Sequence, residues 1–105
     1  MTTFTKQPRD VLDYDVDMSD WFSELPHDDI QSVEVLVSSL AEPEPTLVVG
    51  PPPHLPLVLI GVRPVRFKLW LGGGSNYVDY VVTCVVTTQQ DRQKEIEFKV
   101  KVRDK

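Results

Sequence analysis

Three aspartates at alternate positions are the first residues of this chain whose types and spacing could do chemistry. Asp13, Asp15 and Asp17 share one face of a predicted strand, with neighbours about 6–7 Å apart along it. Calcium prefers such clusters of oxygen ligands, although Asp20 or a loop would have to complete the site and no EF-hand spacing is present. The same face could instead be neutralised by basic residues near the C-terminus, Lys99, Lys101 and Arg103. A calcium site, cross-strand ion pairs and a solvated acidic face all stay open, and we assign no metal ligand.

The remaining candidates for catalysis or ligand binding are weaker. The glycine-rich run 72–76 leads into a strand, whereas a phosphate-binding loop leads into a helix and carries a lysine or a spaced third glycine. His27 and His54 lie in separate loops with no second histidine or cysteine spacing nearby, which disfavours zinc. The single cysteine, Cys84, excludes an intrachain disulfide and lies on the apolar face of its strand, so we expect it to be buried. Because no nucleophile, base and acid come together, we expect no enzyme, no catalytic residue and no cofactor.

Strict alternation of apolar and polar residues defines the strands that position these side chains. The longest run covers residues 79–88, and its apolar face consists of Tyr80, Val82, Cys84 and Val86. A polar turn at 89–92 follows, and residues 95–102 alternate again, which predicts a β-hairpin. Residues 65–71 alternate in the same way and place Trp70 on the outward face, where aromatic side chains are typical of interfaces. Packing of Trp70 under a neighbouring loop is the other interpretation.

Further strands are expected within residues 11–18, 30–40, 46–49 and 57–62, with one helical turn or tight bend at Trp21 and Phe22. Turn signals recur about every ten residues, so about seven strands are typical of an immunoglobulin- or fibronectin-like β-sandwich. Tyr80 lies where such sandwiches carry a tyrosine corner, or is an ordinary core residue. We predict an all-β single domain over residues 11–105, with proline-rich loops within 41–56 and an extended N-terminal arm at 1–10.

Length, charge and hydropathy narrow the class of protein. A chain of 105 residues is one domain, and its net charge of −5 argues against nucleic-acid binding. Residues 1–45 hold eleven acidic and two basic side chains, and residues 46–105 hold five acidic and nine basic ones. An acidic half and a basic half favour head-to-tail contacts between copies of the chain. The alternative is that the two regions neutralise each other within the fold. No apolar run approaches a membrane span, and the N-terminal residues lack the apolar core of a signal peptide, so we expect a cytoplasmic origin.

Two stretches of this chain carry a family resemblance. One runs from the glycine turn through Tyr80-Val81-Val82-Thr83-Cys84-Val85-Val86-Thr87-Thr88 to Arg92 and the alternating residues 95–102. The other consists of Lys6-Gln7-Pro8, residues 12–17 and Asp20-Trp21. Both resemble small virion proteins of tailed phages, the fiber–tail adaptor proteins. The proline-rich tract from Pro43 to Pro56 is longer and stiffer than this resemblance leads us to expect, so contacts made by that loop do not carry over.

The resemblance implies a non-enzymatic structural component of a tailed-phage virion, assembled in the host cytoplasm, that joins tail and fibre or baseplate proteins. It further implies several copies in a symmetric assembly, with no nucleic acid and no membrane as partner. Stiff proline loops lose little entropy on docking. We therefore predict partner contacts at Pro51, Pro52, Pro53, His54, Trp70, Lys6 and Arg9. The alternatives are a capsid decoration or neck protein of the same kind of particle, and an immunoglobulin-like module that binds glycans or a cell surface.

Overall fold

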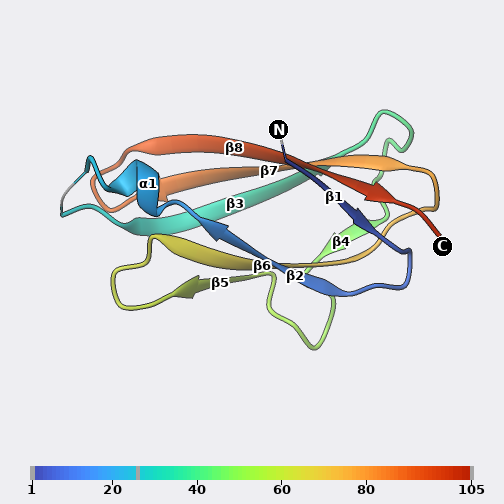
Figure 1. Ribbon diagram of the computed structural model, residues 1–105, viewed down its shortest axis with the longest axis horizontal. Coiled ribbons are helices and arrows are strands. Elements are labelled where there is room, and N and C mark those ends of the chain that lie inside the picture. Colours follow the sequence, from blue (N-terminus) through green and yellow to red (C-terminus); the bar gives the residue numbers. More distant parts are fainter. Residues whose placement is uncertain (1, 26, 105) are drawn as a thin grey trace.

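Two β-sheets face each other across an apolar core in the computed structural model, which describes residues 2–25 and 27–104 (Figure 1). One short helix, α1, follows the second strand. The elements in chain order are β1 (Thr2–Lys6), β2 (Leu12–Asp17), α1 (Ser19–Phe22), β3 (Ile30–Ser38), β4 (Leu47–Val49), β5 (Leu57–Ile60), β6 (Arg66–Gly73), β7 (Asp79–Thr88) and β8 (Gln93–Val102). The all-β sandwich predicted from the sequence is confirmed, with eight strands in the described residues where about seven were expected.

The predicted hairpin forms the centre of the first sheet, called sheet A, whose strand order is β1-β8-β7-β3. β7 and β8 pair antiparallel with Tyr80 opposite Val100 and Cys84 opposite Ile96. β3 pairs antiparallel with the other side of β7 and is the last strand of sheet A on that side. Alternation along these strands therefore sends one row of side chains into the core and the other row to the outer face of sheet A.

The second sheet, called sheet B, is built around β6, which pairs antiparallel with β2 on one side. β4 and β5 share the other side of β6: β4 lies opposite Leu71–Gly73 and β5 lies opposite Arg66–Leu69. The loop between β4 and β5 is therefore an insertion between two pieces of one edge. The edge position predicted for residues 46–49 is confirmed, since β4 is the last strand in the order β2-β6-β4. The prolines on both sides of this segment cannot donate hydrogen bonds to a ladder, which explains why the strand is short.

The core is made of the inward rows of both sheets. Phe67, Leu69 and Leu71 from β6 are fully buried against Val82 and Val86 of β7 and the inward residues of β8. Each side chain of this size gains about 1.5–3 kcal/mol on burial. Cys84 is buried among them as predicted, and burial raises the pKa of its thiol to about 11, so it stays protonated and unreactive.

The N-terminal segment is extended, as expected for residues 1–10, and part of it joins sheet A. Thr2–Lys6 are extended, but they pair in parallel with β8, with Thr2 opposite Phe98 and Lys6 opposite Val102. Phe4 also packs edge-on against Tyr14 of β2 and Phe98 of β8, with ring centroids 5.0 and 5.5 Å away. Local patterning could not predict this strand because Phe4 is its one apolar residue and its partner is almost a hundred positions distant in the sequence.

Tyr80 forms the tyrosine corner that its position suggested. Its ring is fully buried, and its hydroxyl accepts a hydrogen bond from the backbone N–H of Ser75 at 2.9 Å. The same hydroxyl donates to Glu42 and lies 3.0 Å from the hydroxyl of Thr46. Hydrogen bonds from Ser75, Tyr80 and Thr46 lower the pKa of Glu42 to about 2. The corner thus fastens the loop between β3 and β4 to the start of β7.

Candidate partner-binding surface

Trp70 and His54 form a stacked pair on the outer face of sheet B. Trp70 points outward from β6 as its alternation predicted, and His54 lies parallel to the indole with a centroid separation of 3.6 Å and an interplanar angle of 6°. Trp70 therefore points outward, and its ring is also partly covered by a neighbouring loop, as the second interpretation expected. With the imidazole on one face of the indole, that face is not free to stack against a sugar ring.

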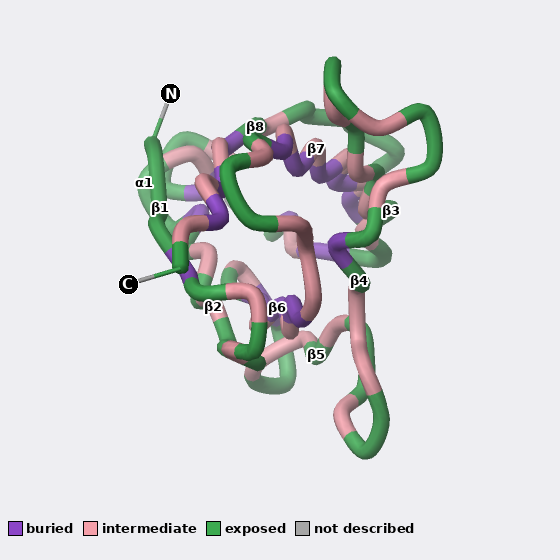
Figure 2. Tube along the Cα trace, turned by 90° about the vertical axis from the view of Figure 1, so that its right-hand side faces the viewer, coloured by how far each residue is buried: buried purple, intermediate pink, exposed green. Residues whose placement is uncertain are grey.

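The β4–β5 loop that carries His54 is held against β6 at both ends. Gly50 donates its N–H to the carbonyl of Trp70 at 2.9 Å, and Trp70 donates its own N–H to the carbonyl of Pro56 at 3.3 Å. Gly50 adopts φ +67°, and a Cβ there would lie 2.4 Å from the Cα of Pro56, so only glycine fits. Viewed from the end of the molecule in Figure 2, this loop projects beyond the two sheets, and its residues are exposed or half-buried.

Apolar side chains surround the stacked pair. Val48 of β4 pairs with Gly72 of β6, and Val58 of β5 pairs with Lys68 of β6, so both valines lie on the outer face. Leu55 is exposed in the β4–β5 loop. We call this set the Trp70 surface: Trp70, His54, Pro51–Pro53, Val48, Leu55 and Val58. Exposed apolar groups that gather around an aromatic residue are typical of protein interaction sites.

The aspartate face of β2 borders this surface and lies beside two basic residues of β6, Lys68 and Arg66. The carboxylate of Asp13 lies 3.1 Å from the ammonium of Lys68, and the hydrogen bond from Lys68 lowers the pKa of Asp13. Asp15 and Asp17 lie opposite Lys68 and Arg66. Cross-strand pairing therefore occurs, but Lys99, Lys101 and Arg103 are not the partners, because β8 belongs to the other sheet. Within residues 2–25 and 27–104 no group of His, Cys, Asp or Glu side chains has the arrangement of a metal site.

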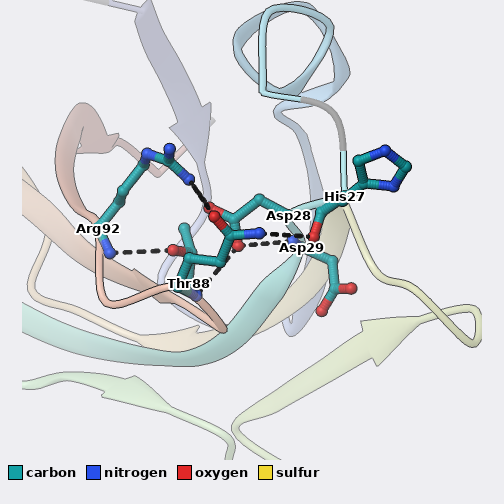
Figure 3. A network of polar contacts seen from close by, with 6 residues as sticks. His27, Asp28, Asp29, Thr88 and Arg92 are labelled. Carbon is teal, nitrogen blue, oxygen red and sulfur yellow. Dashed lines mark hydrogen bonds and ion pairs between the residues drawn. The ribbon is translucent and has the colours of Figure 1, made fainter.

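Asp28 is the centre of a polar network that the sequence did not single out (Figure 3). Its buried carboxylate accepts hydrogen bonds from the Arg92 guanidinium at 2.7 Å and from the backbone N–H groups of Asp29 and Gln90. Burial alone would raise the pKa of Asp28, but the hydrogen bonds from Arg92, Thr88 and the backbone outweigh it and lower the pKa. Because these donors belong to the segment before β3 and to the β7–β8 turn, the network holds the two loops together.

The two predicted contact residues of the N-terminal segment lie in different environments. The Lys6 side chain is buried, and its ammonium donates hydrogen bonds to the backbone carbonyls of Gln7 and Gly73. Burial lowers the pKa of Lys6. Lys6 thus links β1 of sheet A to the end of β6 in sheet B, whereas Arg9 is exposed in the turn that follows. Neither residue lies with His54 and Trp70 on the β4–β5 loop or on β6.

Comparison with known protein families identifies the group to which this sequence corresponds. A family model described as podophage GP4 fiber-tail adaptor protein gp77 matches residues 6–101. The chain belongs to this family. The match begins at the end of β1 and extends through β8 to Lys101, so it includes the tyrosine corner, the Asp28 network and the whole Trp70 surface. Among curated proteins, no sequence matches significantly.

Glu42, Asp28 and Arg92 are the structurally important polar residues that sequence patterning missed. Each lies in a loop or turn, where no periodicity marks which carboxylate is buried. The sequence marks Arg92 only through the family resemblance and gives Asp28 no signal of its own. One signal could have indicated this network: two acids, Asp28 and Asp29, lie directly before one strand, and an arginine lies in the turn of the predicted hairpin. None of the three adds a catalytic or ligand-binding group to the Trp70 surface.

Proposed function

We propose that this chain is a structural adaptor of a tailed-phage virion that joins tail and fibre or baseplate proteins through protein–protein contacts. The observation that carries the proposal is the match to the fiber-tail adaptor family over residues 6–101. A passive role agrees with the polar networks around Asp28 and Glu42, because the hydrogen bonds of both carboxylates hold loops in place. Several copies in a symmetric assembly would present the same surface repeatedly.

The Trp70 surface is the contact that we assign to the partner. Leu55 has 67% of its surface exposed and Val48 has 47%, so apolar area is available without unfolding any element. Buried aromatic anchors surrounded by less important contacts carry most of the binding free energy at interfaces. The β4–β5 loop is fixed by hydrogen bonds at both ends, which reduces the entropy lost on docking. Arg9 adds an exposed positive charge on the turn before β2, whereas the Lys6 side chain supports the fold.

The strand order supports a more detailed fold assignment. We infer an immunoglobulin-like sandwich, in which β2, β6 and β4 correspond to strands B, E and D, and β3, β7 and β8 correspond to strands C, F and G. The tyrosine corner near the start of β7 has the place that it has in strand F of such domains. Loops at the ends and edges of this sandwich type commonly carry binding functions, which fits the β4–β5 loop.

Complementation of a phage that lacks this chain tests the adaptor role. Particles assembled without it should carry tails but no attached fibres in electron micrographs, and the wild-type chain should restore attachment. The variant Trp70→Ala should restore attachment poorly, whereas Val62→Ala, an exposed residue of the β5–β6 turn, should behave like wild type. Fibres that stay attached in particles without the chain would contradict the proposal. Copy number in purified virions then distinguishes a tail position from a capsid or neck position, because these sites differ in symmetry.

A further inference from the structure

β3 is the outermost strand of sheet A on one side, and within residues 2–25 and 27–104 only β7 pairs with it. The strand extends over nine residues, and its one irregularity of register lies between Ile30 and Ser32. A long and regular strand edge is a template for pairing with another strand. The adaptor role proposed above makes no use of this edge.

The hydrogen bonds around β7 show which residues of β3 have backbone groups at the open edge. The N–H of Thr88 donates across the β7–β8 turn, whereas the N–H of Gln89 donates to the carbonyl of Asp29, directly before β3. Because backbone groups alternate sides along a strand, the odd-numbered residues of β7 bond to β3. Glu34 and Leu36 lie opposite odd-numbered residues of β7, so their backbone groups are bonded. The N–H and C=O groups that point to the open edge are those of Val33, Val35 and Val37.

The side chains of these three valines are the least covered part of their row in the core. They point inward, and Val35 lies opposite Cys84 of β7. Cys84 has no exposed surface, whereas Val33, Val35 and Val37 are half-buried. A further strand beside β3 would cover this row and bond its free backbone groups at the same time. The open edge therefore has the chemistry that an extended strand with inward apolar side chains would match.

The other edges of the two sheets carry features that oppose such pairing. β1 has five residues and continues into Pro8, and β4 and β5 have three and four residues between prolines. β2 carries the three aspartates, and charges on an edge oppose the approach of a second strand. β3 contains no proline, lysine or arginine, and Glu34 is its one charged residue. Edge-to-edge pairing of two copies therefore uses β3 of both.

We propose that two copies of this chain pair antiparallel through β3 and so join their A sheets into one. A two-fold axis at Val35 places Val33 opposite Val37 of the second copy on the inner face. On the outer face it places Glu34 opposite Leu36, so the two carboxylates do not face each other. Each of these contacts is made twice, because the same edge is used by both copies.

The pattern of β3 selects this register. An axis at Glu34 would bring the two carboxylates directly opposite each other, which is destabilising. A shift by one residue would set the inward valines against outward residues of the second copy. With the axis at Val35, the strand is complementary to itself on both faces. The pairing concerns contacts between copies and does not depend on the adaptor role.

Amide hydrogen exchange of the purified chain over a concentration series tests the pairing directly. The N–H groups of Val33, Val35 and Val37 should gain protection as the concentration rises, because they become bonded in the dimer. The N–H groups of Glu34 and Leu36 are the internal control and should change less, since they already bond to β7. Sedimentation velocity over the same series should show a monomer–dimer equilibrium. A wild-type chain that stays monomeric, or valine amides whose exchange is independent of concentration, would overturn the pairing.

Opposite charges at position 36 test the register. Leu36→Glu places a carboxylate opposite Glu34 twice per dimer, so it should raise the dimer Kd by about 5–30-fold. Leu36→Lys places an ammonium there instead, and its Kd should lie clearly below that of Leu36→Glu. Val62→Glu is the control, because Val62 is fully exposed on the β5–β6 turn, and its Kd should equal that of wild type. Thermal melting of the three variants checks that the fold is intact.

Equal Kd values for Leu36→Glu and Leu36→Lys would overturn the proposed register, since only a facing charge separates the two variants. Equal Kd values for Leu36→Glu and Val62→Glu would overturn the contact at β3 altogether. None of these results bears on fibre attachment, so this proposal and the adaptor role fail separately.

Discussion

The two core tyrosines differ in what their hydroxyl groups do, and this difference gives a prediction at the scale of single residues. The Tyr80 hydroxyl bonds Glu42, Thr46 and the Ser75 N–H, whereas the buried Tyr14 hydroxyl has no hydrogen-bond partner within residues 2–25 and 27–104. Removing the Tyr80 oxygen leaves partners unsatisfied, so Tyr80→Phe should lower the free energy of unfolding by about 1–3 kcal/mol. Tyr14→Phe should be neutral or slightly stabilising in the same urea titration. Equal losses for both variants would contradict the tyrosine corner.

Glu42 gives a second residue-scale prediction, in the pH dependence of stability. Its pKa falls from an ordinary value of 4.5 to about 2 in the folded chain. A carboxyl with a depressed folded pKa adds stability above its unfolded pKa, and this stability is lost as the pH falls through the folded pKa. Glu42→Gln should therefore destabilise the chain at pH 7, and its difference from wild type should shrink between pH 4.5 and 2. A difference that is independent of pH would contradict this assignment.

At the scale of elements, β1 shows what the sequence could and could not reveal. The hairpin β7–β8 and strand β6 were predictable because alternation by itself separates Val82 or Phe67 from their outward neighbours. β1 was not, since its stability comes from a parallel partner at the far end of the chain and from Phe4 between Tyr14 and Phe98. Cross-strand ion pairs were one of three interpretations of the β2 aspartates, and which strand lies beside β2 is a property of the topology.

This account of β1 predicts that Phe4 anchors the strand. Phe4→Ala removes two edge-on aromatic contacts, so it should lower the free energy of unfolding by about 1–2 kcal/mol. Hydrogen exchange should then show faster exchange of the β1 amides while the β7 amides keep their protection. Thr3→Ala, an exposed outward residue of the same strand, is the control and should leave both quantities unchanged. Unaltered β1 exchange in Phe4→Ala would mean that backbone pairing alone holds the strand.

At the scale of the whole molecule, the partner-binding residues were predictable in type but not in arrangement. Proline content marked the 51–53 segment as stiff and alternation placed Trp70 outward, yet the stacking of His54 on Trp70 depends on where the β4–β5 insertion folds back over β6. Sites assembled from distant segments follow from topology, which a single sequence determines only through the complete fold.

The sandwich also separates the Trp70 surface from sheet A, and this gives a prediction for the whole molecule. The Trp70 surface lies on the outer face of sheet B, and the buried core lies between it and sheet A. Substitutions at distant sites without shared partners act independently. Trp70→Ala should therefore reduce fibre attachment without adding to the loss of unfolding free energy caused by Tyr80→Phe beyond the sum of the two single effects. A double variant whose loss departs from that sum in urea titration would mean that the two sheets are coupled through the core.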